Sequence, residues 1–93
     1  MEFEWDQAKS DACLEKRGFD FAYALHAFFD PDRLVRADRR REYGEDRFQL
    51  AGQIDARVFV LAYTIRSSVI RIISARKANR REVEDYENST REN

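Results

Sequence analysis

Residues 58–75 read VFVLAYTIRSSVIRIISA, and this stretch decides the fold. Two apolar runs rich in β-branched and aromatic residues flank Ser67-Ser68, so they predict two strands, at 58–65 and 69–75, with a tight turn between them. The first run is nearly continuous in apolar residues, which is typical of a strand at the centre of a sheet. The stretch therefore indicates a β-hairpin at the centre of the protein.

Three more strands are expected before the hairpin. Residues 47–51 alternate polar and apolar side chains, and together with the hairpin they predict a meander of three successive strands. A strand begins at 34–36, and Gly44 marks a turn between it and the meander. The short alternating stretch 3–5 favours an edge strand.

Capping residues predict two helices near the start of the chain and one at its end. Asp6 suits the N-cap of a helix at 7–17 that Gly18 ends. Asp20 can cap a second helix that runs to Phe29, before Asp30-Pro31-Asp32. Asn79 and Glu82 have the spacing of a capping box, so the last helix is expected at 80–89, with a thin apolar stripe of Val83 and Tyr86.

The expected order of elements is β-α-α-β-β-β-β-α, an α+β fold with an antiparallel sheet and a C-terminal helix. Residues 1–93 are long enough for a single domain. Hydrophobic residues make up 43% of the chain, which is enough for a core and argues against disorder.

Positive charge is concentrated late in the chain. The formal net charge is −1, but residues 66–81 hold six cations and no acid. Of the 17 basic residues 14 are arginines, whose planar group donates paired hydrogen bonds to phosphate. A nearly neutral protein with such a stretch can attract a phosphate polymer locally.

Several classes of protein are disfavoured. The single cysteine, Cys13, cannot form an internal disulfide, and the single histidine, His26, cannot form a two-histidine acid/base pair. No His/Cys cluster or spaced carboxylate motif indicates a metal site, so neither a metal nor another cofactor is expected. The sequence contains no apolar run of the ~20 residues that a membrane span needs, and no signal-peptide pattern at its start. We therefore expect a cytoplasmic protein.

The candidate site lies where the last strand meets the final helix. Strict alternation places Ile70, Ile72, Ser74 and Arg76 on one face of the strand and Arg71, with three apolar residues, on the other. An arginine on an apolar face needs a partner or a ligand. A cradle for phosphate is therefore expected around the strand end and the helix N-terminus, formed by Arg71, Arg76, Lys77, Arg80 and Arg81. The alternative is that Arg71 pairs with a carboxylate of another strand.

The preceding strands add four candidates. Arg66 lies at the turn beside the last strand, Tyr63 lies in the central strand, and Glu45 and Arg47 enter the neighbouring strand. Glu45 is the carboxylate that we expect to act as a base, although a surface acid is the commoner outcome. Tyr63 is otherwise a half-buried core residue with its hydroxyl at the rim.

Motifs over residues 2–87 resemble those of the BrnT toxins. The most specific is Arg71-Ile72-Ile73-Ser74-Ala75-Arg76 followed by a helix. The others are Phe3-Glu4-Trp5-Asp6, Lys9, Lys16-x-Gly18, Phe28-Phe29-Asp30-Pro31, Gly44-Glu45-x-Arg47 and Tyr63-Thr64. The positions that match the family's motif residues are Glu45, Arg47, Tyr63, Arg71, Ser74 and Arg76. Many relatives carry Asn in place of Cys13 and His in place of Arg17.

The resemblance implies the compact fold of RelE-type toxins and a ribonuclease that halts translation. It also implies a BrnA-like antitoxin with a ribbon-helix-helix part, a heterotetrameric complex, and contact with DNA through the antitoxin alone. Metal-free cleavage of RNA would use Arg71 and Arg76 to stabilise the phosphate, Glu45 to take the 2′-hydroxyl proton, and Tyr63 or a cation to assist the leaving group. Flanking phosphates would be held by Arg66, Lys77, Arg80 and Arg81.

Two other functions stay open at this point. The same arginine-rich surface would also suit a non-catalytic module that binds an acidic protein or a nucleic acid. A DNA-binding repressor is less favoured, because no helix-turn-helix pattern with a basic recognition helix is present. The aromatic residues Phe21, Tyr23, Phe28 and Phe29 exceed what two short helices need for one buried face, so some of them could form a docking surface.

Overall fold

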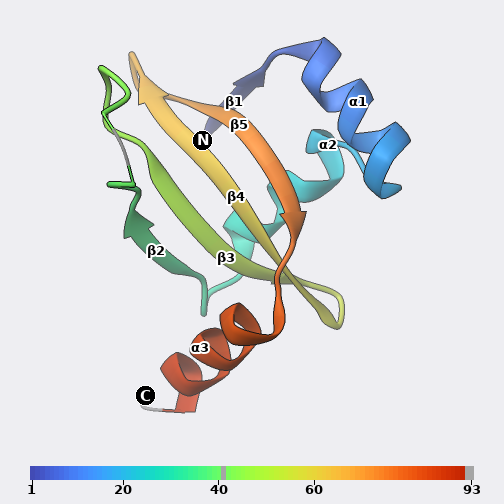
Figure 1. The fold of residues 1–93 in the computed structure, drawn as a ribbon, viewed down its shortest axis with the longest axis vertical. Coiled ribbons are helices and arrows are strands. Elements are labelled where there is room, and N and C mark those ends of the chain that lie inside the picture. The colour runs from blue at the N-terminus through green and yellow to red at the C-terminus, as the bar shows by residue number, and fades with distance from the viewer. Residues whose placement is uncertain (41, 92–93) are drawn as a thin grey trace.

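The computed structural model describes residues 1–40 and 42–91 (Figure 1). Its α+β architecture and C-terminal helix confirm the expected fold class. A five-stranded sheet has the strand order β1-β5-β4-β3-β2. The elements in chain order are β1 (Glu2–Trp5), α1 (Gln7–Arg17), α2 (Phe21–Ala24), the 3-10 helix η1 (Leu25–Phe29), β2 (Leu34–Ala37), β3 (Phe48–Ile54), β4 (Arg57–Arg66), β5 (Val69–Lys77) and α3 (Arg80–Arg91).

The sheet is mixed, so the expectation of an antiparallel sheet is wrong for one pair of strands. The β3-β4-β5 meander is antiparallel, as predicted, and β2 pairs antiparallel with β3. By contrast β1 runs parallel to β5, with Glu4 beside Arg71. Parallel pairing needs a long connection, and here residues 6–68 lie between the two strands. As predicted, β1 is an edge strand.

The capping predictions are confirmed. The Asp6 side chain accepts hydrogen bonds from the N–H groups of Ala8 and Lys9, and Gly18 ends α1 at φ 85°. The Asp20 side chain accepts from Tyr23 N at 2.9 Å. The second helix differs from the prediction, because its α-helical part ends at Ala24 and the chain continues as a 3-10 helix.

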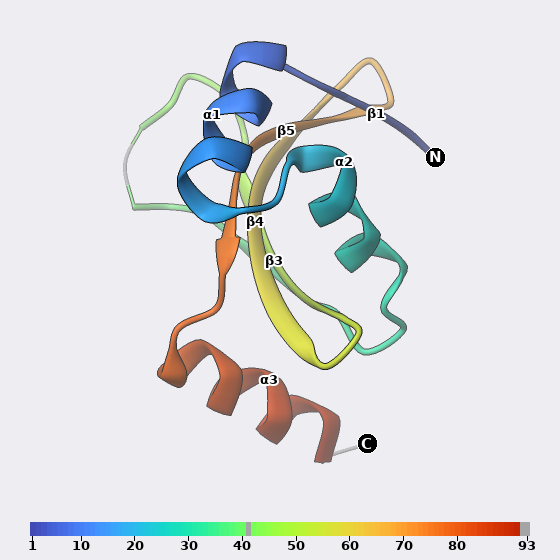
Figure 2. The same ribbon diagram turned by 90° about the vertical axis from the view of Figure 1, so that its right-hand side faces the viewer.

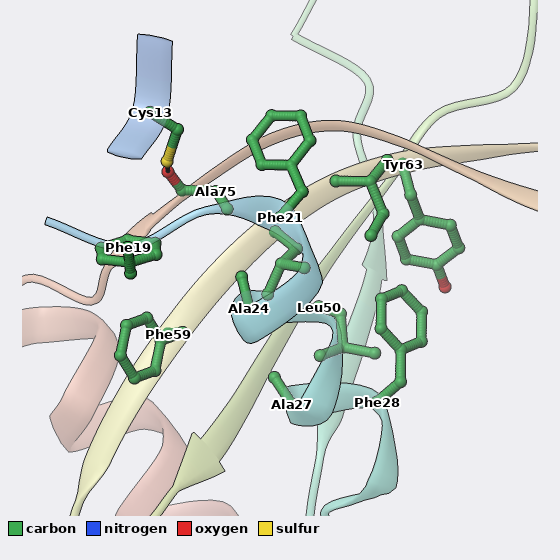
Figure 3. Close-up of a cluster of buried hydrophobic side chains, with 12 residues drawn as sticks. Cys13, Phe19, Phe21, Ala24, Ala27, Phe28, Leu50, Phe59, Tyr63 and Ala75 are labelled. Atoms are coloured by element: carbon green, nitrogen blue, oxygen red, sulfur yellow. Dashed lines mark hydrogen bonds between the residues drawn. The ribbon is translucent and has the colours of Figure 1, made fainter. Parts of the chain in front are cut away.

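Helices α1, α2 and η1 cover one face of the sheet (Figure 2). The core lies between them and the inward side chains of the central strands (Figure 3). It includes Phe21, Phe28, Leu61 and Ile72, each at most 4% exposed. Of the aromatic residues considered for docking, Phe21 and Phe28 are therefore core residues. Tyr23 and Phe29 are exposed, at 40% and 58%.

A β-bulge in β5 changes which side chains share a face. Ser74 pairs with Ala62 and Ile72 pairs with Tyr63, so Ile73 is an extra residue without a partner on β4. Both Ile72 and Ala75 consequently point into the core, at 1% and 3% exposure. The strict alternation expected from the sequence is wrong here, and Arg71, Ser74 and Arg76 all lie on the face away from α1 and α2. We call this the open face.

Helix α3 packs against the lower end of the open face (Figure 1). Its buried residue is Tyr86, at 5% exposure, whose hydroxyl donates to Asp30 and lies 3.4 Å from the side-chain oxygen of Gln53. Burial alone would raise the pKa of Asp30, but hydrogen bonds from Tyr86, Gln53 N and Asp32 N outweigh it and lower that pKa. The helix is therefore attached through polar contacts as much as apolar ones.

Gly52 allows η1 to approach β3 closely. A Cβ atom at this position would lie 3.0 Å from the carbonyl carbon of Ala27, closer still to its oxygen. Because these are backbone atoms of η1, the helix would have to move to admit a methyl group. We expect Gly52→Ala to destabilise the fold by roughly 1–3 kcal/mol, the usual effect of overpacking.

Urea unfolding followed by circular dichroism measures this difference. Gly44→Ala is the control, because Gly44 has a positive φ of 74° but no atom within 4 Å of the added Cβ. Gly44→Ala should lower the free energy of unfolding through backbone strain alone. A Gly52→Ala protein as stable as the native one would contradict the close packing of η1 on β3.

Candidate functional site

The bulge brings three motif residues of β5 to the open face. The register places Arg71 opposite Thr64, Ser74 opposite Ala62 and Arg76 opposite Val60. Arg66 is paired with Val69, so it is a diagonal neighbour of Arg71 on the same face. Strict alternation predicts Arg71 and Arg76 on opposite faces, which is wrong because the bulge at Ile73 shifts the register.

Glu45 forms the centre of a charged cluster at the upper end of this face. Its Oε1 accepts from Arg66 Nη2 at 3.0 Å, and its Oε2 accepts from Arg47 Nε at 3.4 Å. The Arg47 guanidinium also lies 4.0 Å from the ring centroid of Tyr43. Nearby, the hydroxyl of Thr64 donates to the carbonyl of Asp46 at 2.6 Å, which fixes the loop against β4. Three of the expected residues are thus in contact.

The cluster sets the ionisation of Glu45. Hydrogen bonds from Arg66 above all, and also from Arg47, hold its pKa below the usual range despite some desolvation. The carboxylate is therefore ionised at neutral pH and able to accept a proton. The same shift makes it a weaker base than an ordinary glutamate.

Arg71 pairs with a carboxylate of its own chain. Its Nη1 donates to Glu4 Oε2 of β1 at 3.0 Å, so the alternative considered for Arg71 is what the structure shows. The side chains are 31% and 42% exposed, so the pair is open to solvent rather than enclosed. Glu4 engages one terminal nitrogen, and the rest of the guanidinium remains available to a ligand on the open face.

Arg76 is held more completely. Its Nη1 and Nη2 donate to the two oxygens of Glu82 at 2.6 and 2.8 Å. The hydrogen bonds that Arg76 donates are the main cause of the lowered pKa of Glu82, and the same bonds raise the pKa of Arg76. Glu82 also forms the predicted capping box, because Asn79 N donates to its Oε1 and Asn79 Oδ1 accepts from its backbone N–H.

Sequence reasoning did not identify Glu4 as the partner of Arg71 or Glu82 as the partner of Arg76. Glu4 and Arg71 are 67 positions apart, so no local pattern pairs them. It also missed Arg36 of β2, whose Nη2 lies 3.4 Å from Asp85 Oδ2 of α3. The Glu4–Arg71 pair could be predicted only if the parallel pairing of β1 with β5 were already known.

Tyr63 is not brought together with the arginines. It lies on the helix-covered face, stacked on Phe48 and in edge contact with Phe28, and is 7% exposed (Figure 3). Burial raises its pKa, which agrees with a core position. Lys77, paired with Phe59, also lies on that face.

The remaining basic candidates lie on α3. Both Arg80 and Arg81 are exposed in its first turn, and Arg80 pairs with Glu84 at 3.5 Å. Cys13 is a core residue whose thiol lies 3.5 Å from the carbonyl oxygen of Ala75, and burial raises its pKa. His26 contacts the carbonyl of Tyr23 through Nδ1. Neither residue approaches the open face.

The described residues were compared with the requirements of a metal site and of a membrane-spanning helix. Within residues 1–40 and 42–91, no three His, Cys, Asp or Glu side chains come close enough to hold a metal ion. None of the helices in the same part of the chain has the length and apolar character needed to cross a membrane.

A family model described as "Ribonuclease toxin, BrnT, of type II toxin-antitoxin system" matches residues 5–82. The chain belongs to the BrnT family. Membership makes it a ribonuclease toxin and implies an antitoxin partner. A search of curated proteins found no match. The matched segment covers every strand from β2 to β5 and ends at Glu82, so it includes Glu45, Arg66, Arg71 and Arg76 of the open face.

The Glu45 cluster makes a direct prediction about titration. Removing Arg66, the largest cause of the lowered pKa of Glu45, should raise that pKa towards the ordinary range of a glutamate. Titration of the Glu45 carboxyl carbon by NMR in the native protein and in Arg66→Ala measures the change. Arg57→Ala, which removes an exposed arginine elsewhere on β4, is the control. An unchanged Glu45 pKa in Arg66→Ala would contradict the ion pair.

Proposed function

We propose that this BrnT toxin is a metal-independent endoribonuclease of the cytoplasm that cuts RNA on the open face and so inhibits translation. The observation that supports this most directly is Arg71. It stands next to Thr64 and diagonal to Arg66, and Glu4 occupies one of its terminal nitrogens. The other donors of its planar group suit a phosphate.

The proposed reaction uses the 2′-hydroxyl of the RNA itself. Glu45 takes the hydroxyl proton, the 2′-oxygen bonds to phosphorus, and the bond from phosphorus to the 5′-oxygen breaks. The products are a 2′,3′-cyclic phosphate and a 5′-oxygen that takes a proton from water. Arg71 and Arg66 stabilise the additional negative charge of the transition state. Glu45 and Arg66 are already in contact at 3.0 Å, which favours this division of roles.

Arg76, unlike Arg71, has both terminal nitrogens engaged before RNA binds. Both terminal nitrogens of its guanidinium are bonded to Glu82, so a phosphate must replace that carboxylate before Arg76 can bind it. Tyr63 has no part in the proposal, because it lies on the other face of the sheet. Arg80 and Arg81 are exposed at the start of α3 and suit loose contact with flanking phosphates.

The partner is proposed from the resemblance. A BrnA-like antitoxin with a ribbon-helix-helix part would neutralise the toxin in a heterotetramer and supply any contact with DNA. The RelE-type fold belongs to the same proposal, and the mixed sheet with a helix after its last strand supports it. One domain, spanning residues 1–93, would carry the whole activity.

Arg71→Ala is expected to abolish RNA cleavage and growth arrest while the protein stays folded, because Arg71 is partly exposed and contributes no core contact. Cleavage of a labelled RNA by the purified variant, with circular dichroism as the check on folding, measures this. Arg57→Ala is the control and should retain activity, since Arg57 is exposed and lies at the opposite end of β4 from Arg66.

Cleavage by Arg71→Ala at a nearly native rate would refute the assignment. Expression of the native chain without its antitoxin also separates the two leading functions. A ribonuclease toxin arrests growth, and a non-catalytic binding module does not.

RNA binding should weaken with salt. Each phosphate contacted by a cation contributes a slope of about −0.7 to the logarithm of the binding constant against the logarithm of the salt concentration. Fluorescence anisotropy with a non-cleavable RNA measures the slope. Affinity that does not change with salt would count against binding through phosphates.

A further inference from the structure

A second basic surface lies on the other side of β5. A hollow between α1 and the edge of β5 is lined by Lys9, Ala12, Cys13, Lys16, Arg17, Phe21, Ile73, Ser74 and Ala75. We call it the α1–β5 groove. It is separate from the Glu45 cluster, and the reaction proposed above does not use its cations.

The cations of the groove share one side of α1. Lys9, Lys16 and Arg17 fall at helical spacing around the buried Cys13, so they lie above one another along the side that faces β5. The acids of this helix, Asp11 and Glu15, fall on the opposite side. The arrangement concentrates positive charge over the groove although the whole helix is nearly neutral.

These cations differ from the arginines of the open face in having no carboxylate partner. Arg66, Arg71 and Arg76 are each within 3.0 Å of a carboxylate oxygen of their own chain. In the part of the chain that the structure describes, no carboxylate lies within ion-pair distance of Lys9 or Lys16. The charges of these two lysines are therefore free to bind an external anion, whereas each of the three arginines must share its donors with a carboxylate.

The edge of β5 connects the groove to the open face. β1 pairs with β5 at residues 69–72, and beyond them the edge of β5 borders α1 instead of another strand. Ser74 lies in this second part, pairs with Ala62 on the open face, and also lines the groove. A chain that passes over Ser74 would thus reach from Arg71 to Lys16 and Lys9.

We propose that the α1–β5 groove binds the phosphodiester backbone of single-stranded RNA outside the reacting phosphate. Lys9 and Lys16 each neutralise one phosphate, and Arg17 lies at the end of the track. Lysine suits such a task, because its compact charge on a flexible stem tolerates different phosphate positions. The groove then contributes affinity without sequence preference. This inference rests on the proposed function, since it assumes that RNA is the substrate of the open face.

The test compares two double variants that change the net charge equally. Lys9→Gln/Lys16→Gln removes both lysines of the groove, and Arg33→Gln/Arg57→Gln removes two exposed arginines away from it. The probe is a single-stranded RNA with 2′-O-methyl groups throughout, which cannot be cut through its own 2′-oxygen. Its dissociation constant is measured by anisotropy over a range of salt concentrations, and kcat and KM are measured with the unmodified RNA.

The lysine variant should bind the probe more weakly. Its salt slope should be shallower by about 1.4, at about 0.7 for each lost phosphate contact. KM should rise while kcat at saturating RNA stays unchanged, because the reacting groups are intact. The arginine variant should behave like the native protein.

Equal effects of the two variants, or no effect of either, would overturn the proposal. A lysine variant that binds normally but loses kcat would also overturn it, since the lysines would then act in catalysis. The proposed reaction fails in a distinguishable way. Native protein that binds the probe through the lysines but cuts no RNA would refute catalysis on the open face and leave the groove standing. Native protein that does not bind the probe would refute both.

Discussion

The extra residue at Ile73 is the constraint on which the rest of the structure depends. Without it, a strand that buries Ile72 would expose Ala75 and turn Arg76 towards α1. With it, both Ile72 and Ala75 enter the core, and Arg71 and Arg76 emerge on the same face. The bulge therefore lets one strand bury its apolar side chains on one face and present its arginines on the other. The bulge also lies next to the point where the pairing of β5 with β1 ends, at Ile72, and where Ser74 lines the α1–β5 groove.

Charge is organised differently on the two sides of β5. On the open face Arg66, Arg71 and Arg76 each pair with an acid from another element: Glu45 of the β2–β3 loop, Glu4 of β1 and Glu82 of α3, respectively. Arg47 shares Glu45 with Arg66. These pairs are partly exposed, so each adds little to stability, and their main effect is to fix the guanidinium groups in place. On the α1 side the lysines are unbalanced. The protein thus has one surface on which arginines are paired with acids and another on which lysines are not.

Local patterns predicted much of the fold and less of the site. Asp6, Gly18, Asp20 and the Asn79–Glu82 pair act within a few residues, so their structures followed from spacing. The bulge left no clear signal, because Ile72 and Ile73 are both apolar and the sequence alone does not say which of them faces the core. The parallel pairing of β1 and the Glu4–Arg71 contact join the two ends of the chain and could not be read from either end alone. Tyr63 matched a motif, but the face it occupies is set by its neighbours in the sheet.

Glu82 belongs to two structures at once. One of its oxygens accepts from Asn79 N at the start of α3, and the same oxygen and its companion bind the two terminal nitrogens of Arg76. The first turn of the last helix and the orientation of a sheet arginine are thus tied to a single carboxylate. A ligand that draws Arg76 away from Glu82 removes the ion pair that ties the first turn of α3 to β5. Binding of a ligand to Arg76 and the attachment of α3 are therefore coupled through the carboxylate of Glu82.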